Sequence, residues 1–302
     1  MTTVPQQRIL VIGKVGQIGW SLQRTLTPLG AIVARDHIEL DLANPDLIVK
    51  AVREVRPTLI VNAGAYTAVD KAESEKDLAM AINGTGPGIL AEEAKKLGAG
   101  IVHYSTDYVF DGTKGSPYSE EDSPSPLNTY GKTKLAGDQA VQDSGAPYLI
   151  FRTSWVYGMR GQNFLRTILH LFQEREEIRI VDDQFGAPTW SRLISETIAQ
   201  VLAQIFSPQT KGSLKDFSGV YNLSCSGKTS WYGFTAAIAE FVARNHLAPK
   251  VSRIAPIPSS DYPTPAKRPA YGVLSHDKLQ KTFGLTMPSW ENQMALCLDP
   301  QQ

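Results

Sequence analysis

The sequence contains little cysteine: Cys225 and Cys297 are its only two among 302 residues. Two cysteines do not make the disulfide framework of a small secreted protein, and no Cys-x-x-Cys pair indicates zinc. This usage is typical of a reducing compartment. The polar first seven residues lack the basic flank and apolar stretch of a signal peptide, and no apolar run approaches the ~20 residues that span a bilayer. We therefore expect a cytoplasmic protein that does not bind membranes.

The chain also lacks net charge. Lys+Arg and Asp+Glu both number 30, so the formal net charge is zero. No global basic field is present to gather nucleic acid, although a local basic pocket for a small phosphorylated ligand is compatible with this balance. Hydrophobic residues make up 42% and charged residues 20%, as in ordinary globular proteins. The length fits one large domain or two modest ones.

The first half of the chain alternates short apolar runs with helical patterns. We expect strands at 8–12, 31–34, 58–61, 101–104 and 148–151, and helices at 16–29, 46–56, 84–97 and 130–142. Continuous apolar strands between helices indicate parallel strands that are covered on both faces. Right-handed crossovers then give an α/β fold with a doubly wound, Rossmann-type sheet.

After Arg152 this regularity ends. We expect helices at 163–174, 190–205, 230–244, 276–283 and 289–298, short strands at 178–181 and 219–223, and an extended Pro- and Ser-rich loop at 254–269. The predicted plan is a nucleotide-binding domain over residues 1–155 and a smaller C-terminal α/β lobe, mainly 156–302, that binds the substrate. Segments from about 183 to 222 are expected to return to the first domain.

A glycine-rich turn follows the first expected strand. Gly13, Gly16 and Gly19 have GxxGxxG spacing, which allows a tight turn and leaves the N–H groups of a helix N-terminus free for a pyrophosphate. Asp36 ends the second strand, where a carboxylate can hydrogen-bond an adenosine ribose. Arg35 precedes it and would instead suit a 2′-phosphate. The sequence therefore predicts NADH or NADPH without deciding between them, and both side chains could also be solvated surface charges.

Tyr130 and Lys134 lie at i and i+4, on one face of an expected helix. A nearby ammonium lowers the pKa of a tyrosine, which makes its hydroxyl useful in acid–base catalysis. Thr106 ends the fourth strand, at the sheet edge where ligands of α/β proteins bind, and is expected to hydrogen-bond the substrate oxygen. Asp107 and Tyr108 follow it, so we expect them to contact the substrate.

These residues resemble the extended short-chain dehydrogenase/reductase family, and more closely its members that act on dTDP-4-dehydro-L-rhamnose. The signature stretches are GKVGQIGW (13–20), VNAGAYTAVDKAE (61–73), HYSTDYVFDG (103–112), PLNTYGKTKLAGD (126–138), FRTSWVYG (151–158), DQFGAPT (183–189) and YPTPAKRP (262–269). The resemblance covers nearly the whole chain. It implies NAD(P)H-dependent reduction of the C4 keto group to dTDP-L-rhamnose, for cell-surface polysaccharide.

The resemblance also implies a role for each matching position. Cofactor contacts are implied for Gly16, Gln17, Ile18, Asp36, Asp41, Leu42, Ala65, Tyr66, Thr67, Tyr104, Tyr130 and Lys134. Contacts with the dTDP-sugar are implied for Thr106, Asp107 and Trp155. Lys267 or Arg268 suits the diphosphate by charge. Without the resemblance, Trp155 is equally well explained by packing, and the two cations by solvation of a loop.

One departure from the family concerns magnesium. Some members form dimers with Mg²⁺ held by interface glutamates, one of which follows the Trp of the first signature stretch. Here that position is Ser21, which argues against a metal-bridged homodimer.

Two other functions fit the same fold. One is a nucleotide-sugar 4-epimerase or dehydratase, although Asp107 is not followed by the glutamate of the commonest dehydratase pattern. The other is a regulatory subunit like the reductase-like partner of methionine adenosyltransferase. The intact Tyr130, Lys134 and Thr106 favour catalysis over this second alternative.

Overall fold

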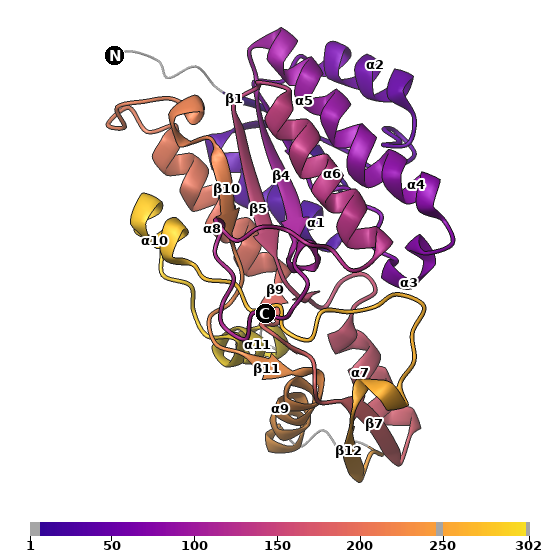
Figure 1. Ribbon diagram of the computed structural model, residues 1–302. Helices are drawn as coiled ribbons and strands as arrows, with labels where there is room; N and C mark the ends of the chain where they lie inside the picture. The colour runs from indigo at the N-terminus through magenta and orange to yellow at the C-terminus, as the bar shows by residue number, and fades with distance from the viewer. Residues whose placement is uncertain (1–6, 246–249, 300–302) are drawn as a thin grey trace.

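A six-stranded parallel sheet forms the centre of the molecule (Figure 1). The computed structural model describes residues 7–245 and 250–299. The strands, in their spatial order, are β10 (Gly219–Asn222), β5 (Tyr148–Thr153), β4 (Gly100–Thr106), β3 (Leu59–Asn62), β1 (Gln7–Ile12) and β2 (Gly30–Arg35). Each neighbouring pair is parallel. The order reverses between β1 and β3, which makes the loops after these two strands the expected ligand site.

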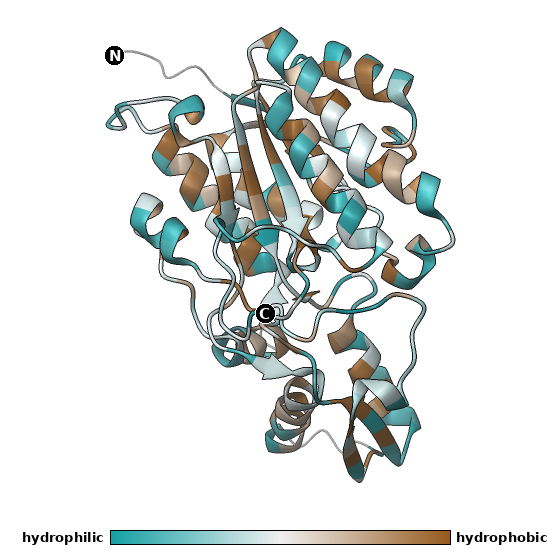
Figure 2. Cartoon of the chain, in the orientation of Figure 1, coloured by the Kyte–Doolittle hydropathy of each residue, from teal (hydrophilic) through white to brown (hydrophobic). Residues whose placement is uncertain are grey.

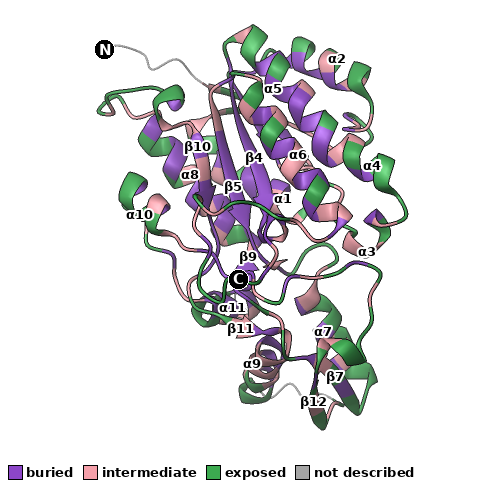
Figure 3. Ribbon diagram, viewed as in Figure 1, coloured by how far each residue is buried: buried purple, intermediate pink, exposed green. Residues whose placement is uncertain are grey.

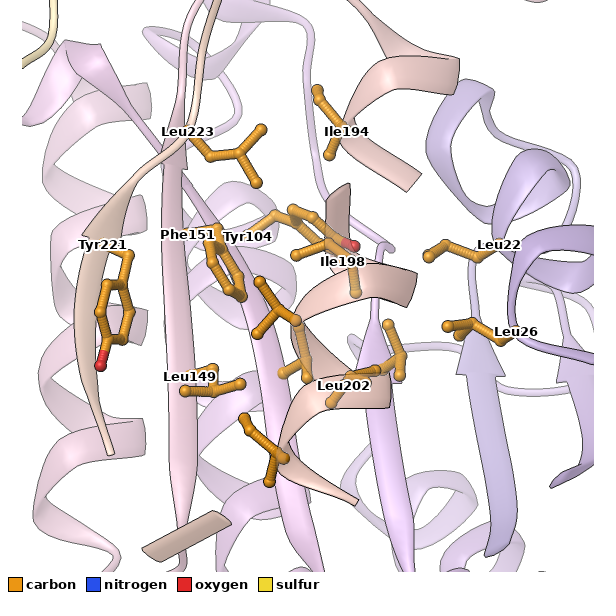
Figure 4. Close-up of a cluster of buried hydrophobic side chains, with 14 of the residues drawn as sticks. Leu22, Leu26, Tyr104, Leu149, Phe151, Ile194, Ile198, Leu202, Tyr221 and Leu223 are labelled. Atoms are coloured by element: carbon orange, nitrogen blue, oxygen red, sulfur yellow. The ribbon is translucent and has the colours of Figure 1, made fainter. Parts of the chain in front are cut away.

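Helices cover both faces of this sheet. Those on one face are α1 (Gln17–Thr25) and α8 (Ser191–Ile205), and those on the other are α2 (Pro45–Val55), α5 (Gly86–Leu97) and α6 (Thr129–Asp143). Because β3, β4 and most of β5 are buried on both faces, they begin with continuous rather than alternating apolar runs, and their polar residues lie toward the carboxyl ends (Figures 2 and 3). Figure 4 shows Ile194, Ile198 and Leu202 of α8 packed between the sheet and α1.

A second, smaller core lies below the sheet in Figure 1. It is built from α7 (Phe164–Glu174), α9 (Trp231–Arg244), α11 (Trp290–Leu298) and the parallel pair β7 (Glu177–Val181) and β12 (Arg253–Ile257). Aromatic residues fill it, including Phe172 and Phe234, both almost fully buried. Of the C-terminal half of the chain, α8 and β10 pack with the central sheet rather than with this core.

Short elements connect these layers. They are η1 (Thr27–Leu29), α3 (Val69–Ala72), α4 (Lys76–Met80), η2 (Ala81–Thr85), η3 (Asp107–Val109), β6 (Val156–Tyr157), β8 (Phe185–Gly186), β9 (Thr189–Trp190), η4 (Leu214–Phe217), β11 (Thr229–Ser230), η5 (Ser259–Asp261) and α10 (Asp277–Phe283). Within residues 7–245 and 250–299, no helix is both long and apolar enough to cross a membrane.

The structure confirms the doubly wound α/β fold and corrects one expected loop. The segment 254–269 is not extended loop throughout, because β12 pairs with β7 in parallel register, Pro256 opposite Ile180. Proline is excluded from central strands but is tolerated at a sheet edge, and both strands of a two-stranded sheet are edges. The prolines of this segment therefore do not exclude a strand.

Candidate active site

The turn after β1 presents backbone groups at the carboxyl edge of the sheet. Gly13 has a φ of 84°, in the left-handed region that favours glycine, and its N–H donates to the Arg35 carbonyl at 2.9 Å. The first residue after Gly16 opens α1, and no side chain caps that helix. A Cβ on Gly19 would lie 2.1 Å from the Gly13 oxygen. This closely packed turn, with uncapped N–H groups, fits a cofactor pyrophosphate.

Charged side chains surround the end of β2. The Asp36 carboxylate accepts hydrogen bonds from the Ile38 and Glu39 backbone N–H groups at 2.9 and 3.3 Å. It also pairs with Lys14 of the glycine-rich turn at 3.5 Å, while Arg35 pairs with Glu39 at 3.7 Å. A carboxylate for a ribose hydroxyl and two cations for a 2′-phosphate are therefore both present here.

The other cofactor residues implied by the resemblance lie in the loops after β2 and β3. Leu42 is buried in the sheet core, and Asp41 accepts a hydrogen bond from the Ala43 N–H at 2.9 Å. Ala65, Tyr66 and Thr67 follow β3, in a loop whose start touches the glycine-rich turn, since a Cβ on Gly13 would lie 2.9 Å from the Ala63 backbone carbon. The structure thus brings the three loops to one edge of the sheet.

Tyr130 and Lys134 lie at the start of α6. Asn128 caps this helix by accepting from the Gly131 N–H at 2.8 Å. A Cβ on Gly131 would lie 2.2 Å from the Tyr108 oxygen, so the glycine lets α6 approach η3 closely. The rings of Tyr108 and Tyr130 then meet edge to face, with centroids 5.7 Å apart. The structure thus brings Tyr130 together with η3, which contains Asp107 and Tyr108.

The electrostatics of Tyr130 differ from the expectation. Burial raises its pKa to about 12, a hydrogen bond with Thr106 opposes this rise, and the carboxylates of Asp107 and Asp138 add to it. The Lys134 ammonium does not produce the predicted decrease. Its Nζ instead donates to the Tyr104 carbonyl at 2.5 Å. Tyr130 is therefore a protonated phenol at neutral pH.

Lys134 is itself 2% exposed, and burial lowers its pKa to about 8.

The Tyr104 ring packs into the core beside Phe151 (Figure 4), where its hydroxyl has no hydrogen-bond partner among the described residues. A buried, unpartnered hydroxyl close to the sheet edge fits a polar group of a bound ligand.

Asp107 is the most perturbed carboxyl of the site. It is 2% exposed, and burial raises its pKa to about 7, against hydrogen bonds from Ser154 and Thr106. The Ser154 hydroxyl donates to Oδ2 at 3.0 Å and the Thr106 hydroxyl to Oδ1 at 3.1 Å. The chain passes directly over this carboxyl, because a Cβ on Gly272 would lie 2.3 Å from Oδ2.

Trp155 adopts a strained conformation where the chain enters the second core. Its φ of 46° is rare for a large residue. The indole stacks on Trp231 with centroids 3.5 Å apart and planes at 7°. Gly186 lies against its other side, where a Cβ would come within 2.5 Å of Cε2. Trp155 is thus held in a slot by two segments distant in the sequence.

Arg268 is already paired. Its guanidinium forms a bidentate ion pair with Asp70 of α3, at 2.7 and 3.1 Å, and the neighbouring Lys267 side chain is exposed. The Asn128 side-chain amide donates to the Lys267 carbonyl at 2.8 Å. The segment 262–269 is therefore fixed across the N-terminus of α6, next to Tyr108 and Tyr130.

Sequence reasoning missed several residues that shape the site. Asn128 carries a readable signal, since Asn before a helical pattern is a common N-cap. Ser154, Trp231 and Gly272 carry none, because their contacts are with residues remote in the sequence. Asn83 is similar: it lies in a π-helical turn, accepts from the Tyr66 N–H at 2.9 Å and donates to Thr133 at 3.3 Å.

The position relevant to magnesium is Ser21 in α1. It is 7% exposed, and its hydroxyl donates to the Gln17 carbonyl at 3.5 Å. Within residues 7–245 and 250–299, no group of three or more His, Cys, Asp or Glu side chains could hold a metal ion. At this position the chain therefore offers a hydroxyl rather than a carboxylate.

Comparisons with known proteins decide the family. A family model described as the RmlD substrate binding domain matches residues 7–302. A dTDP-4-dehydrorhamnose reductase of Burkholderia thailandensis is 49% identical, with 96% of this chain and 98% of the relative covered. The chain belongs to the dTDP-4-dehydrorhamnose reductase family.

Other members of the dTDP-4-dehydrorhamnose reductase family agree in sequence and structure. The enzyme of Escherichia coli K12 is 44% identical over 94% of each chain. A crystal structure of the Bacillus anthracis reductase in complex with NADP superposes with a TM-score of 0.87 at 36% identity, over 97% of this chain and 98% of that one. The expectation of an NAD(P)-dependent oxidoreductase of the short-chain family is thereby confirmed.

Proposed function

We propose that this protein reduces the C4 keto group of dTDP-4-dehydro-L-rhamnose to the alcohol of dTDP-L-rhamnose. The observation that carries the proposal is the position of Tyr130 beside η3 and Thr106, at the carboxyl end of β4, in a chain of this family. A bound NADPH or NADH supplies the hydride. The protein must then provide one proton to the C4 oxygen and hold the sugar in place.

Tyr130 is the proposed proton donor. Reduction requires a protonated acid at the start of the step, and a phenol whose pKa is raised to about 12 is fully protonated at neutral pH. As the carbonyl oxygen gains charge it becomes a strong acceptor, so the proton moves from the Tyr130 oxygen to it. Thr106 lies beside Tyr130, and we propose that its hydroxyl turns from Asp107 to align the same substrate oxygen.

Lys134 is proposed to hold the cofactor beside Tyr130 through its ammonium. Burial lowers its pKa only to about 8, so the ammonium predominates at neutral pH.

The dTDP-sugar is proposed to lie between η3 and the second core. Asp107, Tyr108 and Trp155 are the residues that we propose to contact it, and Arg268 suits its diphosphate. Since Arg268 is bound to Asp70 in the structure, the diphosphate must compete with a carboxylate for the guanidinium.

The direct test is cofactor oxidation, followed by nicotinamide absorbance, with enzymatically made dTDP-4-dehydro-L-rhamnose. NADPH and NADH are compared, and the keto-sugar not epimerised at C3 and C5 serves as the control substrate. Oxidation that depends on the epimerised sugar supports the proposal. Cofactor binding without oxidation would instead favour another keto-sugar or a regulatory role.

Tyr130→Phe tests the proton donor. We expect kcat to fall by roughly 10²–10⁴-fold, the usual contribution of a positioned general acid. The dissociation constant of NADPH should remain close to that of the wild type, because only one hydroxyl is removed. An unchanged kcat would rule out Tyr130 as the acid.

A further inference from the structure

A buried cluster of charged and polar side chains lies behind Lys134, on the side away from Tyr130's partners in η3. Asp138 of α6 and His103 of β4 are both 0% exposed, and Arg152 of β5 is 4% exposed. Charges are rarely buried without a partner, because desolvation penalises them strongly. The proposed reaction makes no use of these groups, so their presence needs another explanation.

The contacts connect Asp138 to Lys134 through His103. Asp138 lies one helical turn after Lys134, and its Oδ2 accepts a hydrogen bond from the Ser105 hydroxyl at 2.6 Å. Its Oδ1 is 3.8 Å from His103 Nε2. The same Nε2 is 3.4 Å from Lys134 Nζ, so the imidazole stands between the carboxylate and the ammonium.

Asn62 fixes the tautomer of this imidazole. Its Oδ1 accepts from the Gly64 N–H at 3.2 Å, so its Nδ2 is the donor that faces His103 Nδ1, also at 3.2 Å. Burial, and then the Lys134 charge, lower the pKa of His103 well below its usual value, and the ring is neutral. Nδ1 is therefore the acceptor and Nε2 carries the hydrogen, which the ammonium cannot accept. Asp138 Oδ1, 3.8 Å away, is too distant for a hydrogen bond and attracts this N–H by its charge.

We propose that Asp138, acting through His103, is a positioning residue that keeps Lys134 charged and in place at the active site. The proposal rests on the proposed function for its catalytic consequence. The underlying charge coupling is a property of the fold and can be measured without turnover.

The balance of charges explains why the carboxylate matters. Burial is the main cause that lowers the pKa of Lys134, and Asp138 is the group that opposes it. Burial likewise raises the pKa of Asp138 to about 6, so the carboxylate is ionised at neutral pH. Arg152 Nε is 4.0 Å from Asp138 Oδ2. Without the carboxylate, two buried cations would lack their shared counter-charge.

The other carboxylates near α6 are held by other partners. Glu73, which follows α3, accepts from the Thr129 N–H and hydroxyl at 2.7 and 3.1 Å. Asp107 of η3 is held by Ser154 and Thr106, Asp70 of α3 by Arg268, and Glu93 of α5 by Arg53 and Lys96. Lys76 and Asp77 of α4 are exposed to solvent. On β4, Lys134 contacts His103 and the Tyr104 carbonyl, neither of which is negatively charged.

The first test is the pH dependence of kcat in the wild type and in Asp138→Asn. The wild type should lose activity as pH rises through about 8, where Lys134 deprotonates. In the variant this alkaline limb should move down by roughly one pH unit, the effect of losing a nearby opposite charge. Turnover should recover as pH is lowered, and Asp138→Glu should largely restore the wild-type profile. A uniform loss at every pH would mean that Asp138 is merely structural.

The second test needs no substrate. Because the folded pKa of Lys134 lies below the value of 10.5 for a free lysine, the unfolded chain binds the extra proton between these values. Stability contributed by the neutral lysine is therefore present at high pH and lost as pH falls through about 8. In Asp138→Asn this loss should continue to a lower pH, and in a Lys134→Met background Asp138→Asn should produce no such shift.

Controls separate this effect from general damage. Glu93→Gln also neutralises a buried carboxylate, 2% exposed, but on α5 and away from Lys134. It should lower stability without moving either pH profile. If Asp138→Asn does not fold, Ser105→Ala, which removes the hydroxyl bound to Asp138, should shift both profiles in the same direction by less. Absence of wild-type turnover would overturn the proposed function alone, whereas unfolding profiles that coincide would overturn the inference alone.

Discussion

The two sides of the candidate active site differ in whether backbone groups or side chains form them. On the cofactor side, the turn that fits a pyrophosphate consists mainly of backbone in one continuous segment, from Gly13 to the start of α1, with glycines where a Cβ would collide. The substrate side consists of buried side chains brought together from distant segments. There Asp107 contacts Ser154 and lies under Gly272, and Trp155 stacks on Trp231.

The difference teaches which kind of change each side tolerates. A backbone site is sensitive to added volume and insensitive to charge, because its donors are peptide N–H groups. A side-chain site is sensitive to charge and protonation, because burial shifts the pKa of each member. The three predictions that follow test this contrast, beginning with the largest expected effect.

Gly19→Val should damage the cofactor side most. A Cβ there would lie 2.1 Å from the Gly13 oxygen, so the turn must open to accept it. Overpacking of this kind costs about 1–3 kcal/mol or more, and we expect NADPH affinity to fall by roughly 100-fold. Isothermal titration measures this directly.

The matched control is Gly219→Ala in β10. The nearest atom to a Cβ at that position is the mobile end of Lys278, at 3.4 Å, so a methyl group fits. NADPH affinity should not change. If both variants bind NADPH like the wild type, the turn is not a close-packed pyrophosphate site.

The same contrast explains how much of the fold the sequence predicts. Short apolar runs between helical patterns predict the strands of the sheet. The structure places strands β1 to β5 at these runs. β12 was missed because Pro256 and Pro258 suggest a loop, whereas pairing with β7 decides the conformation. The short helices α3 and α4, four and five residues long, contain too few turns for a periodic pattern to be visible.

For the candidate site, local spacing in the sequence indicates which residues are candidates but not their protonation states. The i, i+4 relation of Tyr130 and Lys134 is legible in the sequence. The direction of the pKa shift of Tyr130 is not, because it depends on burial beneath Tyr108 and on the carboxylate of Asp107, which only the folded chain brings near. The sequence likewise does not indicate the ion pair of Arg268 with Asp70, since nearly two hundred positions separate the two residues.

Asp107→Asn tests the charge sensitivity of the substrate side. The amide keeps the shape of the side chain but removes a carboxyl whose pKa is about 7. Either the Thr106 or the Ser154 hydroxyl then faces an N–H₂ group and must reorient. We expect kcat to fall about tenfold, equivalent to one misplaced hydrogen bond in the transition state.

The same variant has a stability signature whose sign is fixed by that pKa. A carboxyl with its pKa raised from 3.8 to about 7 favours folding most when protonated, so its contribution is lost as pH rises through this range. Relative to the wild type, Asp107→Asn should gain stability as pH rises from about 4 to about 7, as measured by urea unfolding. Asp216→Asn is the control: hydrogen bonds from Ser213 lower the pKa of that exposed carboxyl, so no gain is expected. Parallel curves for Asp107→Asn and wild type would show that the carboxyl is ionised throughout.

The smallest effect is expected at the ion pair that joins α3 to the segment 262–269. If the substrate diphosphate recruits Arg268, it must displace Asp70, so Asp70→Asn should lower KM for the dTDP-sugar by about two- to fivefold, the range of a partly exposed ion pair. Arg268→Lys should raise KM, because an ammonium cannot reproduce the bidentate contact. Neither change should alter the KM for NADPH.

The control is Asp261→Asn, which breaks the exposed pair with Arg179 at 3.4 Å. It should leave the KM values for the dTDP-sugar and for NADPH unchanged. An increase in sugar KM for Asp70→Asn would show that the ion pair holds Arg268 in its productive position instead of competing for it.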